Sequence, residues 1–502
     1  MKNLFNLNRA KRKPYQRRSS LILVSISSLI LFFFIVSYNQ IPKSLFSIRL
    51  TDNQPPQCRA KISTAREKFM LYAPHSGFNN QLSEFKNALL MAGILNRTLI
   101  VPPILDHHAV ALGSCPKFRV LGPKEIRLSV WDHVIELLRA GRYISFADII
   151  DISSLGSPSA VVKTIDFRVF ASMWCVADID FVCLNEFDSQ SSLFESLKQC
   201  GNLLSGIYGN IDNCLYALDE DCRTTVWTYQ NGEGDAVLDS FQPDEQLKSK
   251  KHISYVRKRQ DVFKTLGPGS VAESAAVLAF GSLFTAPYKG SELYIDIHEA
   301  RRDPLVQSLI ENIKFLPFVP EVVNAGKKFA LETIKVPFLC AQLRLLDGQF
   351  KNHWKATFIN LKQMLESLRQ RGSRPIRIFV MTDLPEGNWT GSYLGDLARD
   401  SESFKLYSLK EDDEFVIQTA RKIAAAGHGL RSQSFRRTLD RVDKQKKPCA
   451  AQKLPDVLLY IEEAICSCAS LGFVGTAGST VAENIELMRK FDVCSTHSVT
   501  VS

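Results

Sequence analysis

Four short segments place polar or glycine-rich turns directly after an apolar run. They span residues 75–81, 342–344, 381–383 and 473–484. Backbone N–H groups at the start of a helix bind phosphate, and a guanidinium group binds it through two parallel hydrogen bonds. Because the segments combine both kinds of group, they predict a site for a ligand that carries phosphate.

The first segment is a turn that leads from an apolar run into a helix. Gly77 permits a sharp turn and a close approach of the backbone to a ligand. Asn79 and Asn80 add neutral donors beside the N–H groups of the helix start. His75 is the nearest side chain that titrates close to neutral pH. A polar helix cap is the structural alternative for this segment.

The second segment ends a predicted strand, residues 336–344, with Gln342 and Arg344. An arginine fixed at a strand end can hold a diphosphate through two hydrogen bonds and stabilise it as a leaving group. An arginine in a salt bridge at the edge of the sheet is the alternative.

The third segment places Asp383 after a strand predicted at 376–381. A carboxylate at this position could accept a hydrogen bond from a nucleobase or a ribose hydroxyl. An aspartate that only shapes the turn is the alternative.

The fourth segment is a loop of small residues that leaves a strand and opens a helix at Ser479 and Thr480. Its N–H groups and two hydroxyls suit a second phosphate contact. The segment lacks the lysine of a Walker loop and is not a strict GxGxxG. A helix cap is the alternative for Ser479.

The elements around the first segment form a strand, a helix and a second strand. Residues 69–72 are apolar, and residues 98–101 form another apolar run before two prolines. Between them, apolar side chains recur at helical spacing and predict a helix over 79–95. A βαβ unit implies a parallel sheet with its ligand at the carboxyl ends of the strands.

The same pattern recurs late in the chain and predicts a second α/β domain. Expected domains are 67–324, with long inserts, and 325–502, the boundary lying near Asn324. Helices are predicted over 357–371, 454–470 and 479–490, the last started by a serine cap, with further strands at 404–407 and 471–474.

The N-terminus predicts a membrane anchor. A basic tail, residues 1–20, precedes Leu21–Tyr38, eighteen residues without a charge, which as a helix span about 27 Å. A cleaved signal peptide is the alternative. The basic excess before the span favours a cytoplasmic N-terminus, and the short span favours the Golgi or endoplasmic reticulum. Residues 39–66 are expected to form a stem before a lumenal domain.

Charge and cysteines agree with that compartment. The net charge is +10, but seven basic residues lie in the first eighteen, so the remainder is near +3 (10 − 7) and nucleic acid is not an expected partner. Five of twelve cysteines fall within 48 residues and predict disulfides. The sequence has no CxxC motif, so a structural zinc site is not expected. Asn96 and Asn388 stand in glycosylation sequons.

Several charged patterns are not expected to form sites. Asp178 and Asp180 match a DxD metal motif, which arises often by chance. Acidic runs at 219–221 and 411–414 lack the spacing of a calcium loop. The basic stretch 431–447 is typical of an inserted surface loop.

Together the motifs resemble a family. Gly77 to Gln81, followed by a helix and by residues 96–103, is similar to the N-terminal motif of protein O-fucosyltransferases. The order of Arg344, then Thr382 and Asp383, then the loop at 475–480 is similar to the rest of that pattern, and the plant branch looks closest. The resemblance covers about residues 68–490.

The resemblance implies a GT-B fold, with two Rossmann-like domains facing a cleft, and GDP-fucose as donor. It implies inverting, metal-independent transfer to a hydroxyl of a protein or glycan, without a cofactor. Arg344 would bind the β-phosphate, Asn79 or Asn80 the donor phosphate and sugar, and Asp383 the nucleoside. Ser479 and Thr480 would hold the diphosphate.

Two departures from the family pattern bear on activity. Gln342 replaces a histidine, and Ser76 stands where some members have a glutamate that acts as base. His75 could take that role, or the leaving diphosphate could take the acceptor's proton. The alternative function is a non-catalytic relative that binds a glycan or partner, or a calcium-responsive signalling component.

Overall fold

The structure is a computed structural model that describes most of the chain from residue 67 to residue 495. The tail, the predicted anchor and the stem lie outside the described residues. Within the described residues, no helix is both long and apolar enough to cross a membrane. The described ranges are 67–106, 121–156, 162–177, 179, 187–220, 224–229, 238–241, 255–284, 295–297, 303–335, 337–346, 353–372, 375–431, 454 and 456–495.

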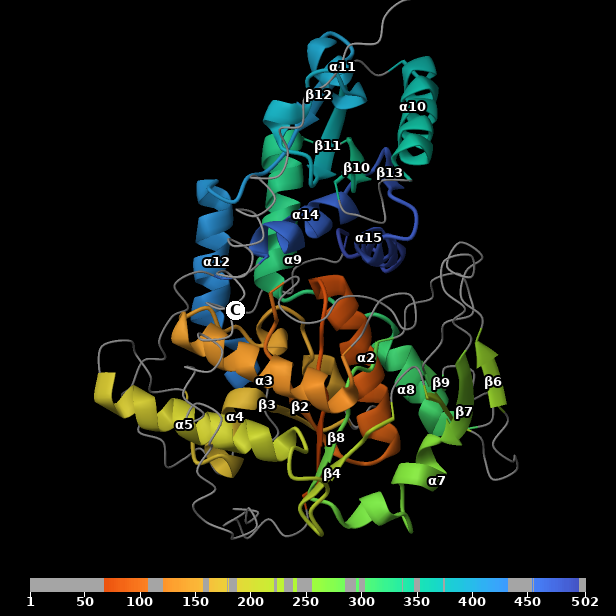
Figure 1. Cartoon of the computed structure of the whole chain (residues 1–502). Helices are drawn as coiled ribbons and strands as arrows, with labels where there is room; N and C mark the ends of the chain where they lie inside the picture. Colours follow the sequence, from red (N-terminus) through yellow and green to blue (C-terminus); the bar gives the residue numbers. More distant parts are fainter. Residues whose placement is uncertain are drawn as a thin grey trace, which may run out of the picture. The chain divides into compact units, whose positions relative to one another are not determined.

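The first sheet is parallel and has the order β3-β2-β1-β8-β4, and Figure 1 labels four of its strands, β2, β3, β4 and β8. Its central strand has neighbours on both sides and is fully buried, which explains its unbroken apolar sequence. The strands predicted at 69–72 and 98–101 are both confirmed. The five strands are β1 (Phe69–Leu71), β2 (Thr98–Val101), β3 (Thr164–Asp166), β4 (Leu215–Ala217) and β8 (Val277–Ala279).

Helix α2 (Phe78–Ile94) follows β1 and confirms the predicted helix to within one residue at each end. It is buried on nearly all sides, so even its polar side chains at Asn79, Gln81 and Glu84 lie in the interior. Buried polar groups need partners, and these provide the contacts of the site. The other helices of this half are α3 (Pro123–Arg139), α4 (Phe167–Trp174), α5 (Phe187–Leu204), α7 (Val262–Leu266) and α8 (Pro304–Lys314), with short 3-10 helices at Phe146–Asp148, Ser153–Gly156 and Val271–Ser274.

A small mixed sheet of order β6-β7-β5-β9 lies in the inserts and was not predicted. Its longest strand carries Arg257, Lys258 and Arg259, a charged stretch that does not resemble a buried strand. Pairing with neighbours distant in sequence stabilises it. The strands are β5 (Thr225–Thr228), β6 (Leu238–Phe241), β7 (Tyr255–Asp261) and β9 (Ile295–Asp296).

The second large sheet is also parallel, with the order β12-β11-β10-β13. The α/β class and two parallel sheets are therefore confirmed. Its strands are β10 (Leu339–Leu343), β11 (Ile376–Thr382), β12 (Phe404–Tyr407) and β13 (Gly472–Gly475). Its helices are α9 (Pro320–Lys328), continued by a π-helix at Phe329–Ile334, α10 (Trp354–Gln370), α11 (Tyr393–Arg399), α12 (Glu414–Ala426), α13 (His428–Arg431), α14 (Val457–Ser467) and α15 (Thr480–Lys490), with a 3-10 turn at Glu386–Asn388.

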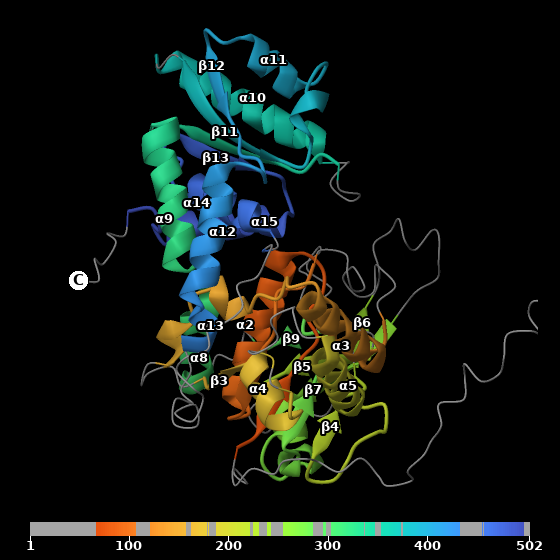
Figure 2. The same cartoon turned by 90° about the vertical axis from the view of Figure 1, so that its left-hand side faces the viewer.

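Helices α9, α12 and α14 lie side by side (Figure 2). Gly326 permits a close approach of α9 to α14, because a Cβ at this position would lie 2.5 Å from the Cβ of Ala464. The boundary expected near Asn324 falls inside α9.

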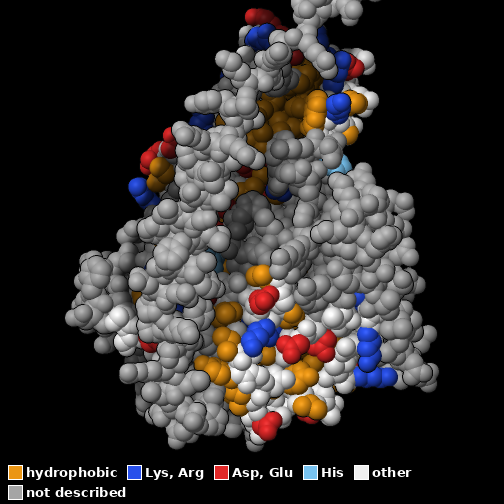
Figure 3. Space-filling view, in the orientation of Figure 1, with side chains coloured by type: hydrophobic (Ala, Val, Ile, Leu, Met, Phe, Trp, Pro, Cys, Tyr) orange, Lys and Arg blue, Asp and Glu red, His pale blue; other side chains and the backbone are white. Residues whose placement is uncertain are grey.

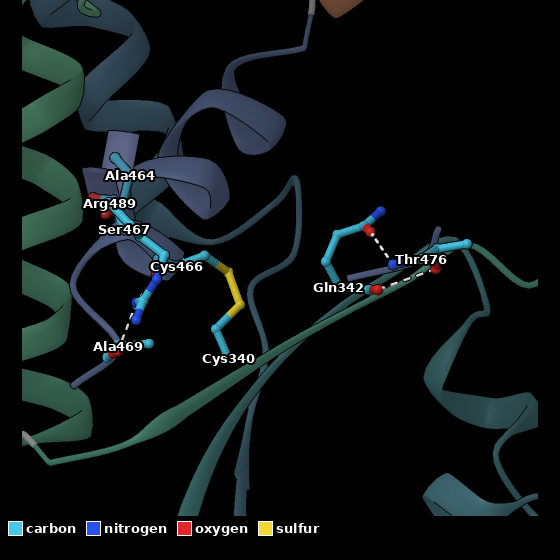
Figure 4. Close-up of a disulfide and its surroundings, with 8 residues drawn as sticks. All are labelled: Cys340, Gln342, Ala464, Cys466, Ser467, Ala469, Thr476 and Arg489. Carbon is cyan, nitrogen blue, oxygen red and sulfur yellow. Dashed lines mark hydrogen bonds between the residues drawn. A yellow bond between two sulfur atoms is a disulfide. The ribbon is translucent and has the colours of Figure 1, made fainter. Parts of the chain in front are cut away.

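Two disulfides lie in the second half, and Figure 4 shows the one between Cys340 and Cys466. Cys340 in β10 is bonded to Cys466 in α14, and Cys468 is bonded to Cys494. Cys466 and Cys468, the closest pair in sequence, therefore belong to different disulfides. In the first half, Cys175 is bonded to Cys200, which confirms that the cysteine cluster forms disulfides.

The surface carries the two sequons and a mixture of charges. Asn96 and Asn388 are both exposed, so a glycan could be attached at either position. In Figure 3, acidic and basic side chains are interspersed on the described part of the lower face, and apolar side chains gather where β10 and β11 lie.

Candidate functional site

The end of β10 is tied to the loop that follows β13 (Figure 4). Gln342 is buried, and its Oε1 accepts a hydrogen bond from the backbone N–H of Thr476 at 3.0 Å. The Thr476 hydroxyl donates to the backbone oxygen of Gln342 at 3.2 Å and accepts from the N–H of Arg344 at 3.0 Å. Thr476 therefore fixes the backbone from which the half-buried Arg344 extends.

Asp383 holds the chain on the other side of Arg344. Its two carboxylate oxygens accept hydrogen bonds from the N–H groups of Leu345 at 2.7 Å and Leu346 at 3.1 Å. The side chain is exposed at the end of β11. In this structure Asp383 shapes the turn after Arg344, the structural alternative for this residue, and a ligand hydroxyl would have to share the same oxygens.

The glycine-rich loop opens helix α15 as expected, but its cap differs from the prediction. Ser479 is the N-cap residue, yet its side chain makes no capping hydrogen bond. Its hydroxyl is buried and has no partner within the described residues. A buried hydroxyl without a partner is uncommon, so this group is available to a ligand. Gly478 has φ +73°, a conformation that favours glycine, and Thr480 is half-buried.

The loop after β1 presents its backbone differently. Gly77 is the N-cap of α2, and Asn80 in the first turn is partly exposed. Gln81 is buried and ties this loop to the chain after β2, donating to the backbone oxygens of Ser76 at 2.8 Å and Leu105 at 2.9 Å. Gly77 and Asn80 are thus the predicted ligand contacts that remain accessible here.

Asn79 is committed to a contact that the sequence did not suggest. Its Nδ2 donates at 2.7 Å to Oε1 of Glu463, a buried residue of α14. Asn484 of α15 donates at 2.6 Å to Oε2 of the same carboxylate. No local signal marks Glu463, because a glutamate in a helix is ordinarily solvent-exposed.

His75 lies in a buried polar network. Its Nδ1 is 2.9 Å from the hydroxyl of Ser76, and its Nε2 is 2.7 Å from the hydroxyl of Ser282 and 3.1 Å from Oε1 of Glu84. Ser282 donates its own proton to Glu84 at 2.7 Å, so Nε2 of His75 carries the proton given to Ser282. Nδ1 is then the acceptor and faces the hydroxyl of Ser76.

Burial sets the protonation of this network. It lowers the pKa of His75 to about 4 and raises the pKa of Glu84. His75 is therefore neutral near pH 7, and its Nδ1 can exchange a proton with the Ser76 hydroxyl. Ser76 has φ +69°, a strained conformation for a residue other than glycine.

The structure thus brings Gln342, Arg344 and Asp383 together with the glycine-rich loop, at the carboxyl ends of three adjacent strands. The loop after β1 is connected to the helices around this second sheet by the hydrogen bond from Asn79 to Glu463 of α14. Within the described residues, no group of three or more His, Cys, Asp or Glu side chains could hold a metal ion. Asp178 and Asp180 lie outside those residues.

Comparison with known proteins agrees with these motifs. Residues 69–492 match the family described as GDP-fucose protein O-fucosyltransferase. A protein of Arabidopsis thaliana named O-fucosyltransferase 30 is 60% identical over 509 residues, which cover 99% of this chain and 100% of that relative.

Solved structures give a weaker likeness. POFUT1 in complex with GDP-fucose aligns at 13% identity over 86% of this chain and 96% of its own, with a TM-score of 0.38. POFUT1 in complex with GDP aligns at 14% identity over the same shares, with a TM-score of 0.39. These scores are too low to transfer any site geometry. The sequence matches span nearly the whole chain, and they show that it belongs to the plant O-fucosyltransferases, a family of glycosyltransferases.

Proposed function

We propose that this protein transfers fucose from GDP-fucose to a hydroxyl of a protein or glycan acceptor. The family description supports the donor. The observation that carries the proposal is the fixed backbone at Arg344. Thr476 accepts a hydrogen bond from the N–H of Arg344, and Asp383 accepts from the N–H groups of the two residues that follow. A cationic side chain on a fixed backbone beside a glycine-rich helix start suits a diphosphate leaving group.

The reaction would be a direct displacement with inversion at the fucose carbon. The acceptor oxygen forms a bond to C1 of fucose while the bond from C1 to the diphosphate oxygen breaks, and GDP leaves with the electron pair. The guanidinium of Arg344 stabilises the charge on that diphosphate, a task that a metal ion performs in other transferases. Ser479, Thr480 and the N–H groups of α15 bind its oxygens.

The acceptor's proton has two possible destinations. One is the network behind Ser76, since the Ser76 hydroxyl can take the proton while passing its own to Nδ1 of His75. The other is the leaving diphosphate itself. The low pKa of His75, about 4, favours the diphosphate unless Glu84 stabilises the imidazolium.

We also propose that the protein is a single-pass membrane protein of the Golgi or endoplasmic reticulum with its catalytic part in the lumen. The disulfides support an oxidising compartment. Resistance to carbonate extraction and sensitivity of its glycans to endoglycosidase would agree, whereas a chain that lacks glycans and washes off membranes would contradict this location.

The direct test is calorimetry of the purified lumenal part with GDP and GDP-fucose, with ADP as the control nucleotide. We expect binding of both guanine ligands and none of ADP, followed by slow release of GDP from GDP-fucose as water replaces the acceptor. Binding of neither guanine ligand would overturn the proposed function.

A second function is favoured by the buried, weakly basic His75 and by Ser76 in place of a carboxylate. It is a non-catalytic relative that binds a glycan or partner in the same site. Binding of GDP-fucose without any GDP release, even with a mixture of glycoprotein acceptors, would support this second function over transfer.

A further inference from the structure

Glu463 is a buried carboxylate whose described partners are two amides rather than a cation. It is inaccessible to solvent in α14, and each of its oxygens accepts one hydrogen bond, from Asn79 and from Asn484. The partners lie in helices α2 and α15. The Glu463 side chain therefore links the start of α2 to α15, the helix that follows the glycine-rich loop.

This contact fixes which way the Asn79 amide faces. Both oxygens of Glu463 accept hydrogen bonds from amide NH₂ groups, so Asn79 directs its Nδ2 toward Glu463. Its Oδ1 then faces away from Glu463. That oxygen is buried and has no hydrogen-bond partner within the described residues. An acceptor left unpaired in the interior is costly, which indicates that it is satisfied in another state of the protein.

The neighbourhood of Asn79 restricts what could satisfy it. The ring of Phe78 lies 4.5 Å from that of Tyr460, one turn before Glu463, so the start of α2 is packed firmly against α14. The hydroxyls of Tyr460 and Ser479 are also buried without described partners. Unpaired polar atoms thus occur on α14, at the start of α15 and on α2, two residues after Gly77.

An amide oxygen discriminates between the parts of a sugar nucleotide. Diphosphate oxygens are themselves acceptors at neutral pH and repel it, whereas a hydroxyl group donates to it. Recognition through Asn79 therefore selects a hydroxyl. This differs from Asn80, whose accessible side chain retains both an acceptor and donors for the ligand.

We propose that Glu463 is a positioning residue that holds Asn79 with its oxygen toward the donor sugar, where it accepts a hydrogen bond from a sugar hydroxyl. Glu463 then sets how strongly the protein distinguishes the sugar nucleotide from the free nucleoside diphosphate. This inference rests on the proposed function, because it assumes a GDP-sugar in the site.

The test compares GDP-fucose with GDP by calorimetry on the same lumenal protein, with chromatography to verify that the donor stays intact. In Asn79→Ala the acceptor is lost. In Glu463→Gln the side chain can donate to Oδ1 of Asn79, which turns the amide and removes the acceptor from the site. Glu462→Gln, the adjacent and only partly buried glutamate of α14, is the matched control.

We expect both Asn79→Ala and Glu463→Gln to bind GDP-fucose about tenfold more weakly, the effect of losing one hydrogen bond. Binding of GDP should stay within about twofold, and Glu462→Gln should match the wild type. Thermal unfolding of each variant checks that it is folded. The ratio of the two affinities is the decisive readout, because a merely structural role would weaken both ligands together.

Three results would overturn the inference. An equal loss for GDP and GDP-fucose would show that Asn79 and Glu463 shape the nucleotide site or contact the ribose. No loss for either ligand would show that a water molecule or the packing alone satisfies Asn79. If the wild type binds neither ligand, the proposed function fails and this inference fails with it, whereas the first two results leave the proposed function intact.

Discussion

The two parallel sheets end in loops of similar sequence character but different structure. After β1, the polar side chains of His75, Gln81 and Glu84 are buried and bonded to one another or to the backbone. After β10 and β13, Arg344 is half-buried and the Ser479 hydroxyl has no described partner. The loop after β1 is therefore rigid and contains buried groups that can exchange protons, whereas the loops after β10 and β13 present groups that can bind a ligand.

The largest effect is expected from the second loop. Arg344→Ala should reduce the release of GDP from GDP-fucose by about 10²- to 10³-fold, as expected when a preorganised charge is removed from a leaving group. Product GDP measured by chromatography provides the rate. Arg369→Ala, an exposed arginine of α10, should behave as wild type. Unchanged turnover in Arg344→Ala would remove the functional distinction between the loops.

In the first loop, loss of the network should cost stability. Glu84→Ala leaves the Ser282 hydroxyl and the backbone N–H of His75 without an acceptor in the interior. We expect the free energy of unfolding to fall by about 3 kcal/mol, measured by urea denaturation. Glu366→Ala on the surface of α10 is the control. A loss no larger than in this control would mean that the network is not what makes the loop rigid.

Between the loops, Glu463 should make stability depend on pH. Burial raises its pKa from 4.5 to about 7, against the opposing effect of the two asparagine hydrogen bonds. The folded state therefore binds this proton more tightly than the unfolded state, and the carboxylate destabilises the fold above pH 7. As the pH falls from about 7 toward 4.5, the cost, about 3 kcal/mol, is relieved.

The measurement is the difference in unfolding free energy between wild type and Glu463→Gln across that range. Other buried carboxylates titrate alike in both proteins and cancel. The difference should vary with pH mainly between 4.5 and 7, in favour of the wild type at the acid end. A constant difference would show that Glu463 does not change its protonation on folding.

The smallest effect is expected from removing the Thr476 hydroxyl, which holds the backbone of Arg344. Thr476→Val keeps the shape of the side chain but removes the hydroxyl that contacts Gln342 and Arg344. We expect GDP to bind about fivefold more weakly, corresponding to about 1 kcal/mol. Thr382→Val, whose hydroxyl accepts from the N–H of Leu384, is the control, and an equal effect there would indicate general loosening of the strand ends.

Sequence periodicity predicted the two parallel sheets well. Runs such as 69–72, 98–101 and 376–381 are apolar because both faces of their strands are covered, and the structure confirms all three. Strand β7 was not predicted because its sequence is charged, and pairing with β5 and β6 stabilises it.

The candidate site was predictable where the position of a residue depends only on the strand or loop that carries it. Arg344 and the glycine-rich loop follow strands, so their place at one edge of the sheet could be foreseen. The roles of Thr476, Ser282 and Glu463 could not, because each depends on a partner more than 20 residues away. Glu84 received no role from the sequence, and it is buried because α2 has hardly any exposed face.

The bond between Cys340 and Cys466 has a consequence for biosynthesis. It joins residues 126 positions apart, and closing so long a loop stabilises the fold by about 5 kcal/mol in the chain-entropy account. Gln342 follows one cysteine by two residues and Glu463 precedes the other by three. The bond can form only after both ends have been synthesised, so a chain held in a reducing environment would lack the covalent frame on both sides of its binding residues. Formation of this disulfide would then distinguish chains that have reached an oxidising compartment and completed folding from chains that have not.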